Sequence, residues 1–178
     1  MSPDELVMHL KPPPGIRPRP YPPWRDQVYR VSLTVMAVAL LFRATAGFLG
    51  AGGLGVVSLG LLAASTLSAA YFFLVWIERF RWLVLALSVA GVAALPVSGV
   101  LAVGLFLAAS SVMAAKETHC FHFVTGRLIP WVSLVVALAG FVPALGLVYA
   151  AGLGVVGLLW LPLLWARFRM RLLSVSAP

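Results

Sequence analysis

Three long stretches of the chain contain no charged side chain, and each is too long for one membrane-crossing helix. They cover residues 44–77, 82–115 and 128–166, with 34, 34 and 39 residues without Asp, Glu, Lys or Arg. A single span needs about 20 apolar residues, so each stretch predicts a hairpin of two helices. Backbone polar groups in hydrocarbon must bond within the segment, which predicts helices and not open strands.

The pattern therefore predicts an all-α membrane protein, a six-helix transmembrane bundle made of three hairpins. The expected helices cover residues 28–48, 54–77, 80–96, 99–121, 128–146 and 149–167. Three regions follow from this: an arm at 1–26, a transmembrane domain at 27–168 and a short basic tail at 169–178. The arm is rich in proline, which lacks a backbone donor, so we expect it to be extended and not helical.

The basic residues gather at one end of the predicted hairpins. Of the 13 Lys and Arg residues, all but Arg43 fall in or beside the arm, in segments 78–81 and 116–127, or at residues 167–171 in and just before the tail. Positive charge is retained on the cytoplasmic side of membranes. We therefore expect both termini to be cytoplasmic in a bacterial inner membrane. The arm contains no apolar stretch before a cleavage site, so the first helix is expected to act as the insertion signal.

Composition agrees with a lipid environment. The chain is 62% hydrophobic and 10% charged, with a mean hydropathy of +1.02, whereas soluble domains have about 25% charged residues. The net charge is +8. The basic residues flank apolar blocks and do not line one face, which favours contact with anionic lipid over nucleic acid. The single cysteine excludes an intrachain disulfide and a metal site made only of cysteines.

One segment concentrates chemically active side chains. Lys116, Glu117, His119, Cys120 and His122 supply a base, an acid, two imidazoles and a thiol within seven residues. On a helix, however, successive residues are about 100° apart, so these groups cannot all face one ion. We predict no metal and no cofactor here. The cluster is expected to be structural, with Glu117 paired to an arginine; a reactive thiol or an acid–base role is the alternative.

A charge network is expected where the helices meet the cytoplasmic surface. Its main role would be to fix the register and orientation of the helices, and binding of a lipid phosphate or a small anion is a further possibility. Besides the segment above, its expected members are Arg30, Glu78, Arg79, Arg81 and Arg127.

Arg43 differs from every other basic residue. It lies 13 positions after Arg30, hence about 20 Å deeper along the first helix. Charges inside a membrane are costly and often functional. A side chain that reaches the outer headgroups explains Arg43 equally well, and the sequence leaves both interpretations open.

Two segments carry a resemblance to a known family. Residues 25–30 (RDQVYR) and especially 115–121 (AKETHCF) resemble a family of uncharacterised bacterial integral membrane proteins with a Lys-Glu-x-x-Cys-Phe element. The resemblance places Lys116, Glu117, Cys120 and Phe121 on the motif, and leaves His119 and His122 outside it. It implies a multi-pass membrane protein and supplies no activity.

The sequence contains no phosphate-binding loop, zinc-protease helix or nucleophile elbow. We expect a non-enzymatic scaffold, assembly factor or accessory subunit of a membrane complex, with residues 1–26 available to a partner. One alternative is a lipid-, quinone- or redox-linked protein centred on Lys116, Glu117 and Cys120. Another is a transporter of a small neutral solute, which requires a central polar cavity.

Overall fold

The computed structural model describes residues 22–75, 77–121 and 124–170, and these residues are helical almost throughout. They form six α-helices and two short 3-10 turns, with no strand in these ranges. The all-α prediction is confirmed. The elements are α2 (Pro23–Leu49), α3 (Gly52–Tyr71), α4 (Glu78–Ala94), α5 (Gly99–Phe121), η1 (Val124–Arg127), α6 (Leu128–Gly140), η2 (Pro143–Leu145) and α7 (Gly146–Arg169).

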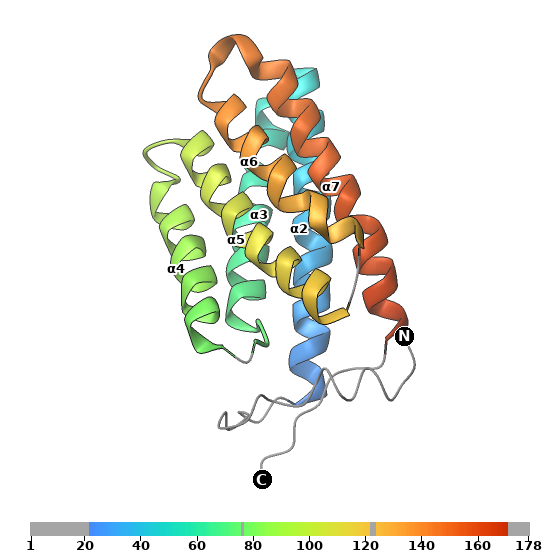
Figure 1. The fold of residues 1–178 in the computed structure, drawn as a ribbon. Helices are drawn as coiled ribbons and strands as arrows, with labels where there is room; N and C mark the ends of the chain where they lie inside the picture. Colours follow the sequence, from blue (N-terminus) through green and yellow to red (C-terminus); the bar gives the residue numbers. More distant parts are fainter. Residues whose placement is uncertain (1–21, 76, 122–123, 171–178) are drawn as a thin grey trace.

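Successive helices run side by side in alternating directions (Figure 1). α2 packs against α3, α4 against α5, and α6 against α7. α7 also returns along α2, and α6 packs on α5. The turns within these three pairs lie at the top of Figure 1, whereas α2 begins and α7 ends at the bottom. Segments far apart in the sequence therefore meet at the lower end.

Four helical segments are long and apolar enough to cross a membrane, namely Pro23–Leu49, Gly52–Tyr71, Gly99–His119 and Pro143–Arg169. The other two helices are shorter: α4 has 17 residues and α6 has 13. At about 1.5 Å per residue they measure about 26 and 20 Å, against a hydrocarbon core of about 30 Å. Six helices were expected and the described residues form six, of which four are long enough for a crossing.

Prolines explain two differences from the predicted boundaries. α2 begins at Pro23 and not at residue 28, because the first position of a helix needs no backbone donor. The helix predicted at 128–146 ends at Gly140 instead. Pro143 cannot donate to the backbone and holds Val142 in an extended conformation (φ −106°, ψ 104°), which stops the helix before it.

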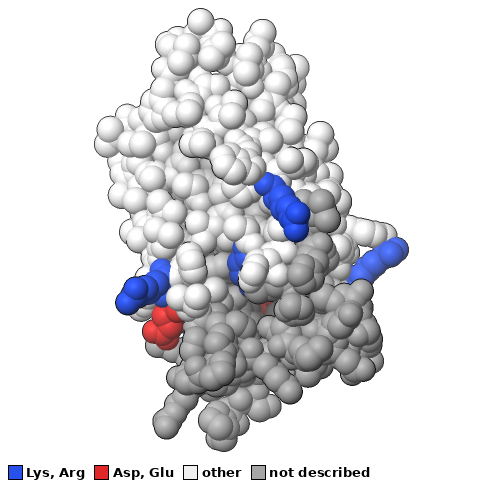
Figure 2. All heavy atoms as spheres, viewed as in Figure 1, with Lys and Arg blue, Asp and Glu red and all other residues white. Residues whose placement is uncertain are grey.

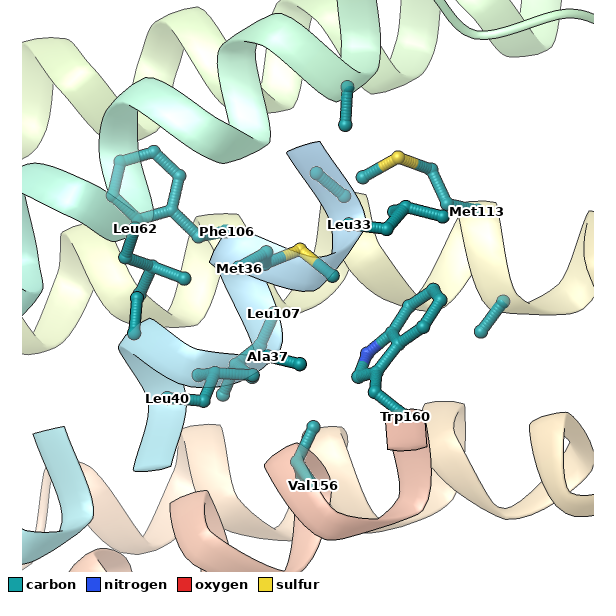
Figure 3. Packing of buried hydrophobic residues seen from close by; sticks show 14 of the residues in the cluster. Leu33, Met36, Ala37, Leu40, Leu62, Phe106, Leu107, Met113, Val156 and Trp160 are labelled. Carbon is teal, nitrogen blue, oxygen red and sulfur yellow. The ribbon is translucent and has the colours of Figure 1, made fainter. Parts of the chain in front are cut away.

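The centre of the helices is filled by large apolar side chains. Leu33 and Met36 of α2, Met113 of α5 and Trp160 of α7 are all fully buried there (Figure 3). The outer surface is also apolar: Val56, for example, is 74% exposed. Helices that are apolar on both their inner and outer faces are typical of membrane spans.

Charge is confined to one end of the face seen in Figure 2. The upper part of that face is uncharged, and the Lys and Arg side chains lie below it, beside the residues that are not described. This is the end at which α2 starts and α7 finishes. On this face the structure separates an uncharged end from a charged end. Arg43 of α2 is the one charged side chain among the described residues that lies toward the uncharged end.

Candidate functional site

Asp26 lies in the first turn of α2 and is bound by two arginines. Arg30, one turn further along α2, approaches Asp26 Oδ2 with Nε at 2.9 Å and Nη2 at 2.7 Å. Arg167 Nη2, from the last turn of α7, lies 2.6 Å from Asp26 Oδ1. All three side chains are at most 3% exposed. Both carboxylate oxygens are therefore engaged by charge-assisted hydrogen bonds.

Glu117, in the last turns of α5, is a second buried acid at the same end. Its Oε1 accepts hydrogen bonds from Lys116 Nζ at 2.8 Å and from the Tyr29 hydroxyl at 3.1 Å. Its Oε2 forms an ion pair with Arg167 Nε at 3.2 Å. Arg167 therefore bridges the two acids, and through them it joins α2, α5 and α7. We call Asp26, Tyr29, Arg30, Lys116, Glu117 and Arg167 the charge cluster.

The charge cluster also stabilises the carboxyl-terminal end of a helix. Arg30 Nη1 donates to the carbonyl of Met170 at 2.9 Å, and Met170 is the residue that caps α7. The last carbonyls of a helix have no partner within it and carry a partial negative charge, which cations stabilise. Lys116 lies over the rings of Tyr29 and Phe73, 5.5 and 5.7 Å from their centroids. Its ammonium is thus held by a carboxylate and two aromatic faces.

This geometry is suited to holding helices together. Each of the four carboxylate oxygens faces a cation, and the hydroxyl of Tyr29 points to Glu117. A general base or nucleophile has to face a substrate, whereas these acids face neighbouring helices. Buried charges are costly unless they are paired, and the ion pairs of this cluster join α2, α5 and α7.

The segment singled out in the sequence divides between two faces of α5. Lys116 and Glu117 point into the charge cluster, whereas His119 is exposed. Two residues separate Glu117 and His119 by about 200° around a helix, so the two side chains face opposite sides. Cys120 belongs to the last turn of α5, but its side chain and all of His122 lie outside the described residues.

Of the charge network expected from the sequence, Arg30, Lys116 and Glu117 belong to the charge cluster, and Glu117 is paired with an arginine. The other four expected members lie on α4 and η1. Arg81 Nη2 reaches the carbonyl of Tyr71 at 3.4 Å, which connects α4 to the end of α3. The others, Glu78, Arg79 and Arg127, have exposed side chains.

Asp26, Tyr29 and Arg167 were not among the members predicted from the sequence. Two signals for Asp26 were available: Pro23 at the first position of a helix, and the four-residue spacing between Asp26 and Arg30. Placing the helix start at residue 28 left Asp26 in the arm. No comparable signal marks Arg167, because sequence alone does not tell which residue of a basic helix end turns inward.

Arg43 lies far from the charge cluster along α2 and contacts a neighbouring helix. Its Nη1 donates to the carbonyl of Gly55 in the first turn of α3 at 3.0 Å. The Tyr149 hydroxyl of α7 lies near the same guanidinium. A side chain at Gly55 would crowd it, since an added Cβ would lie 2.9 Å from Arg43 Nη1. The structure thus uses Arg43 to connect helices near the uncharged end.

Within the described ranges, no group of three or more His, Cys, Asp or Glu side chains is arranged to hold a metal ion. Comparisons with protein-family models, curated proteins and solved structures give no match to this chain. The resemblance to the family with the Lys-Glu-x-x-Cys-Phe element therefore stays a prediction.

Proposed function

We propose that the protein is a six-span membrane protein that acts as a non-enzymatic scaffold, assembly factor or accessory subunit of a membrane complex. The observation that carries this proposal is the charge cluster, in which buried acids and bases from α2, α5 and α7 bind one another. Such a cluster stabilises a fixed arrangement of helices and leaves their outer surface apolar.

The outer surface supports a lipid environment for all six helices. Leu49, Val56, Trp131 and Val135 are 72%, 74%, 72% and 63% exposed. Such surface in water would cost roughly 25 cal/mol for each Å². The helices α4 and α6 are shorter than the hydrocarbon core. Trp82 and the basic residues at the charged ends of these helices can reach the headgroups, which lets a short helix span the membrane.

The confinement of charge supports an orientation with both termini in the cytoplasm of a bacterial inner membrane. Asp26 and Arg167, near the two ends of the described chain, lie within 2.6 Å of each other. Arg79 lies at the start of α4, Lys116 near the end of α5 and Arg127 in η1, and these helix ends lie at the same end of the molecule (Figure 1). Retention of positive charge inside then puts the charged end on the cytoplasmic side.

The packing favours a structural role over the two alternatives. A transporter of a neutral solute needs a polar path, whereas Leu33, Met36 and Trp160 fill the centre. A lipid-, quinone- or redox-linked activity centred on Lys116, Glu117 and Cys120 needs Glu117 to face its substrate. Glu117 is instead 0% exposed and faces Arg167 and Tyr29.

Purification of the tagged full chain from its own membrane in mild detergent tests the proposal. We expect a stoichiometric protein partner in the main size-exclusion peak, identified by mass spectrometry. A chain without residues 1–20, which leaves α2 intact, tests whether the arm binds that partner. Recovery of the full chain as a lone monomer under several detergent conditions would contradict the scaffold role.

A further inference from the structure

A groove follows the outer side of the α5–α6 pair, from the charged end toward the middle of the helices. Its first section has a volume of about 460 Å³ and is lined by residues that include Thr118, His119 and Arg127. Its second section, of about 360 Å³, is lined by residues that include Gly104 and Ala108. Pro130 and Trp131 line both sections, so the two form one continuous surface, the α5–α6 groove.

The two sections differ in chemistry. At the charged end, the exposed side chains of Arg127 and His119 offer a positive charge and a ring N–H, and no acid is among the described lining residues there. In the deeper section, the small residues Gly104 and Ala108 leave space between the helices, and Leu134, 54% exposed, adds apolar surface. The groove is thus basic at its mouth and apolar further in.

Two buried hydroxyls lie along the same groove. Ser133, 2% exposed, lines the deeper section, and Thr118 lines the mouth. Within the described part of the chain, Ser133 Oγ and Thr118 Oγ1 are buried without a hydrogen-bond partner. Both oxygens are closed off from the groove, so a rotation of the side chain is needed to bring either hydroxyl to an acceptor on a bound molecule. A buried hydroxyl without a partner costs free energy, and such a hydrogen bond would remove that cost.

The length of the groove matches one membrane leaflet. Thr118 and Gly104 are 14 residues apart on α5, which corresponds to about 21 Å along the helix. Half of a hydrocarbon core of about 30 Å is about 15 Å. The groove therefore accommodates one acyl chain and has room left for a glycerol and phosphate region at its mouth.

We propose that the α5–α6 groove binds an anionic phospholipid. The phosphate lies at Arg127 and His119, ester oxygens accept from Thr118 or Ser133, and one acyl chain lies along Gly104 and Ala108. The site rests on the membrane placement proposed above. A helix of another protein is the competing occupant, but the basic mouth favours an anion over an apolar helix.

Photocrosslinking tests the site in the full-length protein. The chain is reconstituted in vesicles of equimolar phosphatidylcholine and phosphatidylglycerol, with either lipid carrying a diazirine on its acyl chain. We expect the phosphatidylglycerol probe to label α5 and α6 around Ala108 and Leu134 more strongly than the phosphatidylcholine probe. Equal labelling by the two probes, or phosphatidylglycerol labelling concentrated on another face, would overturn the proposal.

Matched variants test the mouth and the apolar section of the groove independently. Arg127→Gln should weaken phosphatidylglycerol labelling about fivefold, which corresponds to about 1 kcal/mol for one basic residue near the membrane. Arg79 is an exposed arginine of α4 at the charged end of the molecule, and Arg79→Gln should leave the phosphatidylglycerol labelling unchanged. Ala108→Phe should remove the labelling by filling the groove, whereas Ala86→Phe on the exposed side of α4 should not.

Two further readouts keep the outcomes distinct. Ser133→Ala removes only a hydroxyl, so it should fold normally and weaken labelling without abolishing it; unchanged labelling in both Ser133→Ala and Arg127→Gln would overturn the assignment. If a photoreactive amino acid at Leu134 captured a protein and no lipid, the occupant of the groove would be a partner helix and not a lipid. Failure of the protein to integrate into vesicles would instead contradict the membrane placement itself.

Discussion

Arg167 and Asp26 lie 141 positions apart in the sequence and are joined by a contact of 2.6 Å. The contact links the last turn of α7 to the first turn of α2, and Arg167 Nε then reaches Glu117 of α5 at 3.2 Å. One guanidinium thus connects three helices at the charged end. The arrangement of the helix ends depends on this side chain more than on any other in the charge cluster.

Replacing Arg167 should strongly destabilise the protein. Arg167→Met keeps apolar bulk but leaves Asp26 and Glu117 short of a cation, and removing one partner of a buried ion pair costs about 3–5 kcal/mol. Thermal unfolding in detergent measures the effect. The exposed Arg169→Met is the control and should unfold close to the unchanged protein. Equal unfolding temperatures for both variants would show that the charge cluster does not hold the helices.

Tyr29→Phe isolates a single hydrogen bond of the charge cluster. The ring keeps its place against Phe73, 6.0 Å away between centroids, and Glu117 loses only the hydroxyl at 3.1 Å. Hydrogen bonds to charged groups contribute about 1.5–3 kcal/mol. We expect a loss of stability in this range by chemical denaturation, and little change for Tyr71→Phe, whose ring is 55% exposed. An identical effect of both changes would argue against a buried bond at Glu117.

Gly91 tests how closely α4 packs on α5. A Cβ at this position would lie 2.5 Å from the Phe106 ring, which is 1% exposed and cannot move away freely. Overpacking of this kind costs about 1–3 kcal/mol, so Gly91→Ala should lower the unfolding temperature. Gly60→Ala, where nothing lies within 4 Å, should be neutral or stabilising, since alanine favours helices over glycine. Tolerance of both changes would mean that α4 packs loosely.

Much of the helical pattern was predictable from the sequence. The range expected at 99–121 agrees with α5 at both ends, because Pro96 and Gly99 precede it and the charges of the 116–127 segment follow it. Long uncharged blocks predict helices well, since lipid leaves the backbone no other way to bond. The end of α6 was missed because Pro143 lies inside an apolar block that hydropathy alone reads as continuous.

The candidate site was predictable only in part. Lys116 and Glu117 were noticed because polar groups are rare in this chain, yet sequence does not determine which helix face turns inward. Glu117 and His119 are two residues apart and end on opposite sides of α5. The pairing of Asp26 with Arg167 depends on how α7 packs along α2, and no local pattern predicts a contact between residues so distant in the chain.

The most direct test is a cysteine-accessibility measurement that determines on which side of the membrane each end of the helices lies. In a Cys120→Ser background, Val97→Cys marks the uncharged turn between α4 and α5, where Val97 is 81% exposed, and Arg79→Cys marks the charged end. A membrane-impermeant maleimide should label Val97→Cys in intact cells and Arg79→Cys only in inverted vesicles. Labelling of Arg79→Cys in intact cells, or labelling of both positions from the same side, would contradict the account.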